Sequence, residues 1–71
     1  MNATDRSVLD ATPIPANADG SLALCCAIRE GGEWFTAWLI GTGKHSFGPA
    51  YPTAKAAARA SLYLNETRVR A

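Results

Sequence analysis

The residues of this 71-residue chain that could do chemistry are few, and they do not form a catalytic or metal-binding set. His45 is the single histidine, and we predict a core-facing strand position for it, where an interior hydrogen-bonded role is commoner than general-base catalysis. Cys25 and Cys26 are adjacent, and neighbouring strand side chains point to opposite faces, so a disulfide between them would strain the backbone. A tetrahedral metal site needs more ligands than these three residues supply. We therefore predict reduced cysteines, no catalytic residue, no metal site and no cofactor.

A short glycine-containing segment, Gly41-Thr42-Gly43-Lys44, has the composition of part of a phosphate-binding loop. The full GxxxxGKS/T spacing is absent, and we expect this segment in a hairpin rather than before a helix. The carboxylates are few and scattered, so a general acid and a general base cannot be paired. We therefore predict that the chain is not an enzyme.

Composition and charge indicate a small folded domain. The chain is 48% hydrophobic and 18% charged, which is far from the pattern of disordered proteins. A core of this size rarely gives ample stability alone, which favours a partner subunit, for example in a homodimer. The net charge of +1 is small for a nucleic-acid binder, so nucleic acid is a partner that the charge allows but does not require. We find no apolar run that could cross a membrane and no signal-peptide pattern, and we expect a cytoplasmic protein.

Hydrophobic periodicity predicts a first hairpin. Strict two-fold alternation over 22–29 is typical of a half-buried strand, and the pair Gly31-Gly32 favours a tight turn into a second strand over 33–40. With a two-residue loop, Glu30 pairs with Glu33, and the register of every later pair follows.

A third strand and a helix complete the prediction. We expect a three-residue turn at 41–43, a short strand over 44–47, and a helix from Ala54 to about Thr67 with Thr53 as its N-cap. The predicted fold class is α+β, a three-stranded antiparallel sheet (β-β-β-α) packed on one C-terminal helix. The domain spans 21–67, between a partly irregular N-terminal arm (1–20) and a C-terminal tail (68–71).

The predicted register divides the sheet into two faces. We assign to the core the face with Leu24, Cys26, Ile28, Phe35, Ala37 and Leu39. The other face carries both tryptophans together with polar and charged residues, and its members are Arg29, Trp34, Thr36, Trp38, Lys44 and Ser46. A contiguous aromatic surface is seldom left bare in a monomer, so something should cover it. The alternatives are the N-terminal arm with Val8, Leu9 and Ile14, a partner protein or second copy of the chain, and nucleic acid.

Part of the chain resembles a known DNA-binding module. The segments CAIREGGEWFTAWL, GTGKHSFGPAY and PTAKAAARASLYL resemble, in order, the three strands and helix of plant ethylene-response-type factors and of the arm-binding domains of tyrosine integrases. The shared features are a strand with Arg, a short turn, a Trp-containing strand and an alanine-rich helix that opens with Thr-Ala. The resemblance implies that the sheet face reads the DNA major groove, through Arg29, Trp34, Thr36, Trp38 and Lys44.

Taken together, these patterns predict a small non-enzymatic binding protein that acts through protein–protein contact, as an inhibitor or accessory factor of a phage or other mobile element. The alternative is a DNA-binding module of the integrase-arm kind. The predicted partner-binding residues lie on the tryptophan face and on the outer side of the helix: Arg29, Trp34, Thr36, Trp38, Lys44, Ser46, Lys55, Arg59 and Tyr63. This assignment requires that both indole rings point away from the helix.

Overall fold

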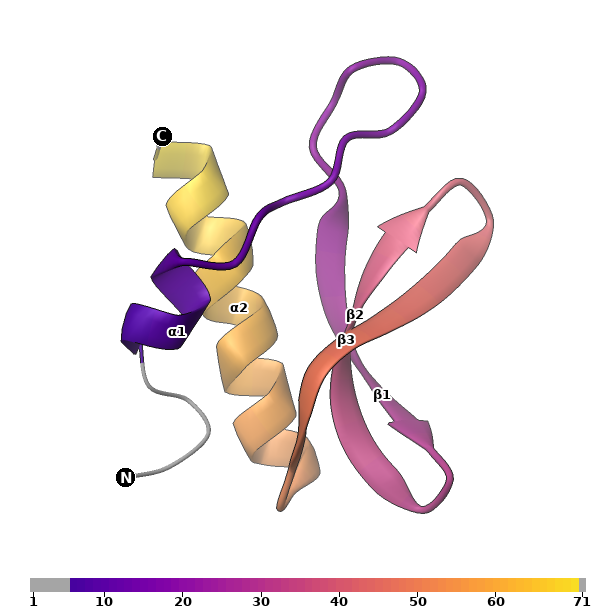
Figure 1. Ribbon diagram of the computed structural model, residues 1–71, viewed down its shortest axis with the longest axis vertical. Coiled ribbons are helices and arrows are strands. Elements are labelled where there is room, and N and C mark those ends of the chain that lie inside the picture. Colours follow the sequence, from indigo (N-terminus) through magenta and orange to yellow (C-terminus); the bar gives the residue numbers. More distant parts are fainter. Residues whose placement is uncertain (1–5, 71) are drawn as a thin grey trace.

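Three strands and one long helix follow one another along the chain, in the predicted α+β order. The computed structural model describes residues 6–70, and its elements are α1 (Arg6–Asp10), β1 (Leu24–Glu30), β2 (Glu33–Ile40), β3 (Gly43–Tyr51) and α2 (Ala54–Arg70). The strands form one antiparallel sheet in the order β1-β2-β3. Figure 1 shows α2 along one side of this sheet, with the short α1 beside α2. None of the helices within 6–70 is long and apolar enough to cross a membrane.

The first hairpin has the predicted register. Gly31 and Gly32 have φ values of 60° and 82°, which suit a tight two-residue turn whose twist matches that of the strands. Glu30 therefore pairs with Glu33, and the following pairs are Arg29 with Trp34, Ile28 with Phe35, Cys26 with Ala37 and Leu24 with Leu39. β1 begins at Leu24 rather than Leu22. Before it, Leu22 forms an isolated bridge with Ala16 in the arm, and the amide of Ala23 donates to the carbonyl oxygen of Pro15 (2.9 Å).

The second hairpin differs from its prediction in turn length and in the length of its strand. Ile40 pairs with Gly43, so the turn has two residues instead of three. β3 then continues past Gly48 and Pro49, where a bulge separates the pairs Phe47–Thr36 and Tyr51–Trp34. β3 is an edge strand, and a bulge on an edge tolerates a proline that lacks an N–H donor.

The helix packs on the opposite face of the sheet from the one that we predicted. Trp38 is 7% exposed and lies in one buried cluster with Ala57, Ala60 and Leu64 of α2. Thr36, on the same face, is 1% exposed. The prediction that both tryptophans point away from the helix was therefore wrong, although the strand pairing from which it was derived is correct.

Side-chain size explains this choice of face. Cys25 and Ala27 of β1, and Ala23 just before it, are small. They pack in one cluster with the equally small Ala57 and Ala60 of α2, so the helix axis can approach β1 closely. The larger indoles of β2 then fill the space beside the helix. The ring of Trp38 stacks on Phe47 of β3, with centroids 4.4 Å apart and an angle of 7° between planes. His45 lies on this same side of the sheet, but it is exposed and not the interior residue that we expected.

Local signals set the ends of α2. The amide of Ala56 donates to the Thr53 hydroxyl (3.1 Å) and the amide of Ala57 to the Thr53 carbonyl (3.2 Å), which confirms Thr53 as the N-cap. The helix runs to Arg70 and so includes most of the predicted tail, because neither glycine nor proline ends it at Thr67.

The N-terminal arm folds back, but mainly onto α2. Leu9 of α1 is buried in the core cluster and Ile14 packs against it, whereas Val8 is exposed. The Tyr63 hydroxyl of α2 donates to the Asp10 carboxylate, and the Arg6 guanidinium lies 5.2 Å from the centre of the Tyr63 ring. The arm therefore contributes to the core that contains Trp38, while α2 is its principal cover.

Candidate interaction face of the sheet

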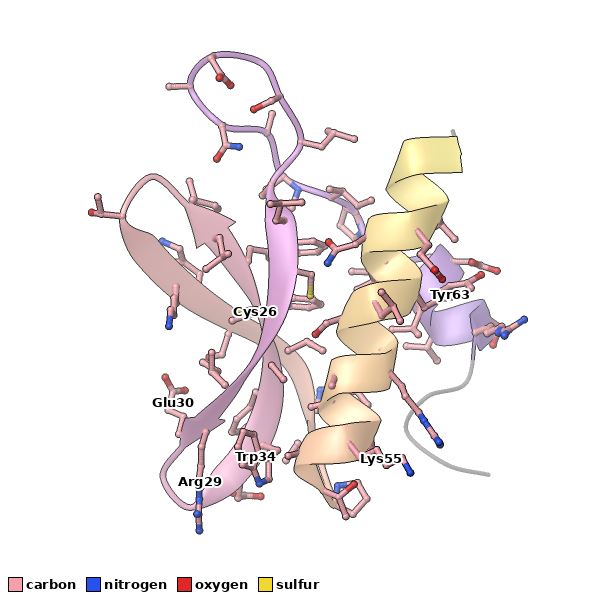
Figure 2. All side chains as sticks on the ribbon, turned by 180° about the vertical axis from the view of Figure 1, so that it is seen from behind. Cys26, Arg29, Glu30, Trp34, Lys55 and Tyr63 are labelled. Carbon is pink, nitrogen blue, oxygen red and sulfur yellow. The ribbon has the colours of Figure 1, made fainter. Side chains whose placement is uncertain are left out.

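The side of the sheet away from α2 carries a second set of apolar residues, which we call the open face. Alternation along the strands places on it Leu24, Cys26, Ile28, Phe35, Ala37 and Leu39, together with the polar residues Glu30, Glu33, Lys44 and Ser46. In Figure 2, Glu30 projects from the sheet on the side away from α2. This is the face that we had assigned to the core.

The apolar residues of the open face are only partly covered by one another. Leu24 is 56% exposed, Ile28, Phe35 and Leu39 are half-buried, and only the small Ala37 at the centre is fully buried. No charged residue occurs between Trp34 and Ile40, so the central strand is apolar on both of its sides. Strands of this kind are typical of sheets covered on both faces.

Charged side chains lie at the two ends of the open face. Glu30 and Glu33 are cross-strand neighbours beside the first turn, where like charges repel. The Ser46 hydroxyl donates to Oε1 of Glu30 (3.1 Å), which draws this carboxylate across the sheet toward β3. Lys44 pairs with Leu39 near the opposite end and is exposed. The open face therefore has an acidic end, an apolar middle and a basic end.

The outer edge of β1 is closed over its first half. The Asn65 side chain of α2 accepts a hydrogen bond from the Cys25 amide and donates one to the Cys25 carbonyl, both at 2.9 Å. The Ala23 amide is held by Pro15, as described above. Because hydrogen-bonding direction alternates along an antiparallel strand, the backbone groups of Ala27 and Arg29 point to the same outer edge. Among the residues that the structure describes, only this short stretch of β1 is left for another strand to pair with.

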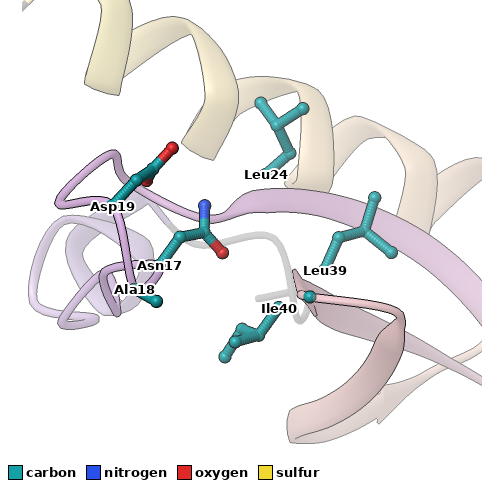
Figure 3. A pocket seen from close by; sticks show the side chains of 7 residues that line it. Asn17, Ala18, Asp19, Leu24, Leu39 and Ile40 are labelled. Atoms are coloured by element: carbon teal, nitrogen blue, oxygen red, sulfur yellow. The ribbon is translucent and has the colours of Figure 1, made fainter.

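A pocket of about 540 Å³ adjoins the Lys44 end of the open face (Figure 3). Its lining residues are Asn17, Ala18, Asp19, Leu24, Leu39, Ile40 and Gly41. The Asp19 carboxylate accepts hydrogen bonds from the amide and hydroxyl of Ser21 (2.9 and 2.6 Å), and these bonds lower the pKa of Asp19. The acidic group of the pocket is therefore used to shape the loop that forms one wall.

The predicted partner-binding residues are spread over three separate places. Lys44 and Ser46 belong to the open face. On the α2 side, Thr36 and Trp38 are buried, Trp34 is half-buried, and the guanidinium of exposed Arg29 lies 6.0 Å from the Trp34 ring centre. These four residues do not form an uncovered surface, which corrects our prediction. The helix residues divide as well, since Lys55 and Arg59 are exposed and Tyr63 is half-buried against α1.

Sequence reasoning missed Leu24, Ile28, Phe35, Leu39 and Glu33 as candidate surface residues. The signal that could have found them is the lack of polar alternation in β2, which indicates a sheet with two apolar faces. A single helix can cover only one of these faces, so one apolar face had to remain.

The cysteines lie on opposite sides of β1, as their adjacency predicts. Cys25 is buried on the α2 side, Cys26 is half-buried on the open face, and neither forms a disulfide. Within residues 6–70, no three His, Cys, Asp or Glu side chains come together in a group that could hold a metal ion. No family model, curated protein or solved structure matches this chain.

Proposed function

We propose that the chain is a small non-enzymatic binding protein, of the inhibitor or accessory-factor kind, and that it binds another protein chain through the open face. One observation carries this proposal: the sheet is apolar on both faces, and α2 covers only one of them. Burial of a large apolar side chain contributes roughly 1.5–3 kcal/mol, so a partner over Ile28, Phe35 and Leu39 would gain substantial binding energy.

Phe35 is the best candidate for the centre of such a contact. Within residues 6–70 it is the only aromatic side chain on the open face. It lies on the central strand and has apolar neighbours on both sides. Aromatic residues at the centre of an interface often account for most of the binding free energy.

DNA binding is the alternative, and the uncovered sheet face is the observation in its favour, because the resembling modules read DNA with such a face. Charge opposes it. The open face carries Glu30 and Glu33 against the single cation Lys44, whereas Lys55 and Arg59 lie on α2, on the other side of the sheet. These cations therefore cannot contact phosphates together with the open face.

The test compares an open-face variant, Ile28→Ser with Phe35→Ser, with the control Leu62→Ser. Leu62 is 57% exposed on α2, so both variants remove exposed apolar surface, but only the first changes the open face. Each protein, checked for folding by circular dichroism, is analysed for oligomeric mass and for the proteins that it captures from the cells that produce it. We expect the open-face variant to have a lower oligomeric mass, or to capture fewer proteins, than the unchanged chain. The Leu62 variant should match the unchanged chain in both. Equal behaviour of both variants and the unchanged chain would refute the proposal.

A further inference from the structure

The chemistry of the open face also indicates its occupant. We infer that the open face binds the open face of a second copy of this chain, in a two-fold symmetric dimer whose facing strands run in opposite directions. This inference rests on the proposed function and names the partner.

The charges at the two ends select this arrangement. Glu33 and Leu39 are six residues apart on β2, so the acidic and basic ends are roughly 20 Å apart at about 3.4 Å per strand residue. A two-fold axis that lies between the sheets and perpendicular to the strands reverses these ends. It brings the first-turn end of each copy, with Glu33, to the level of Leu39 and its β3 neighbour Lys44 in the other copy, and this contact occurs twice. An axis parallel to the strands would instead place acidic end on acidic end.

The side chains of the middle fit the same axis. When the axis passes at the level of the Ala27–Thr36 pair, each Phe35 lies opposite an Ala37, and each Ile28 lies opposite a Cys26. A large side chain then meets a smaller one at each of these contacts, and sheets about 10 Å apart can interdigitate in this way. The Gly31-Gly32 turn of one copy would lie over the pocket beside Leu24 and Leu39 of the other.

The strand edges offer less to a second copy. Pro15 and Asn65 occupy the first half of the β1 edge, and β3 carries Lys44 and Pro49, both of which discourage edge pairing. Face-to-face packing is therefore better supported than extension of the sheet.

The test changes the charges at the two ends of the open face by substitution and measures the mass of the assembly by analytical ultracentrifugation. One variant, Lys44→Glu, makes both ends acidic, and the other, Glu30→Lys with Glu33→Lys, makes both ends basic. We expect the unchanged chain at about 100 μM to have twice the chain mass of 7.5 kDa, as a micromolar Kd requires. Each variant alone should dimerise at least about tenfold more weakly, and the equimolar mixture should regain a dimer containing one copy of each.

Two further measurements make the outcome decisive. Circular dichroism verifies that each variant folds, and the unchanged dimer should weaken in about 1 M salt, where the Debye length is roughly 3 Å. A dimer that forms equally in all preparations, or a chain that stays monomeric, would overturn the inference. A monomer whose captured proteins still depend on Ile28 and Phe35 would overturn the dimer and leave the proposed function standing, whereas a monomer without that dependence would overturn both.

Discussion

Asn65 binds both backbone groups of Cys25, so that a side chain of α2 takes the place of a neighbouring strand at the edge of the sheet. The two residues are 40 positions apart in the chain, and these bonds join the C-terminal half of the helix to β1. A primary amide can do this because its carbonyl oxygen accepts and its NH2 group donates, with the spacing of a peptide group. The contact both attaches the helix and blocks that position to a foreign strand.

Replacing Asn65 should therefore destabilise the fold. Asn65→Ala leaves a partly buried N–H and C=O of Cys25 without their partner, and we expect a loss of about 2–3 kcal/mol. Urea unfolding measures this change, and Glu66→Ala, at the exposed neighbouring position, is the control that should change stability by less than about 0.5 kcal/mol. Equal stabilities of the two variants would show that the amide bonds are unimportant.

The two tryptophans should differ sharply in their effect on stability. Trp38 is buried and stacked on Phe47, so Trp38→Ala should cost about 3–5 kcal/mol. A core of this size supplies roughly that much in total, and we expect this variant to be largely unfolded. Trp34→Ala, at a half-buried position, should remain folded. Far-ultraviolet circular dichroism with thermal melting distinguishes them, and two variants of equal stability would contradict the structure.

Tyr51 should make the fold sensitive to alkali. Burial, and to a smaller extent the charge of nearby Cys25, raises the pKa of Tyr51 above its ordinary value. The folded chain thus keeps a proton that the unfolded chain releases above about pH 10, so stability falls as pH rises beyond that value. Melting temperatures from pH 8 to 11 should drop less steeply for Tyr51→Phe than for the unchanged chain. A Tyr51→Phe variant whose melting temperature drops as steeply as that of the unchanged chain would rule out this cause.

A salt titration separates protein binding from DNA binding. Because the open face has two carboxylates and one ammonium group, we expect no gel shift of duplex DNA even at low salt. A shift that weakens steeply with salt and disappears in Lys44→Ala would favour the DNA-binding alternative. Loss of the shift only in Lys55→Ala with Arg59→Ala would place the contact on α2 instead.

Local signals were sufficient to predict the pairing of β1 with β2 and the start of α2. Gly31 and Gly32 permit one tight turn, and that turn determines every pair between β1 and β2. Thr53 likewise marks the start of α2 through its capping hydroxyl. These predictions succeeded because each depends on a few neighbouring residues.

The choice of the buried face could not be made in the same way. Ile28 with Phe35 on one side and Trp34 with Trp38 on the other are both apolar enough for a core, so alternation alone does not distinguish them. The decision depends on how closely α2 can approach β1, which is a property of two surfaces distant in sequence. The second turn was ambiguous for a related reason, since glycine at both 41 and 43 allows either a two- or a three-residue turn.

The placement of the cysteines on opposite sides of β1 provides a natural chemical marker. In the folded chain, a maleimide reagent should modify Cys26 much faster than Cys25, because only Cys26 is partly accessible. A fluorophore can thus be attached to the open face without any substitution, and its emission would report directly when that face becomes covered.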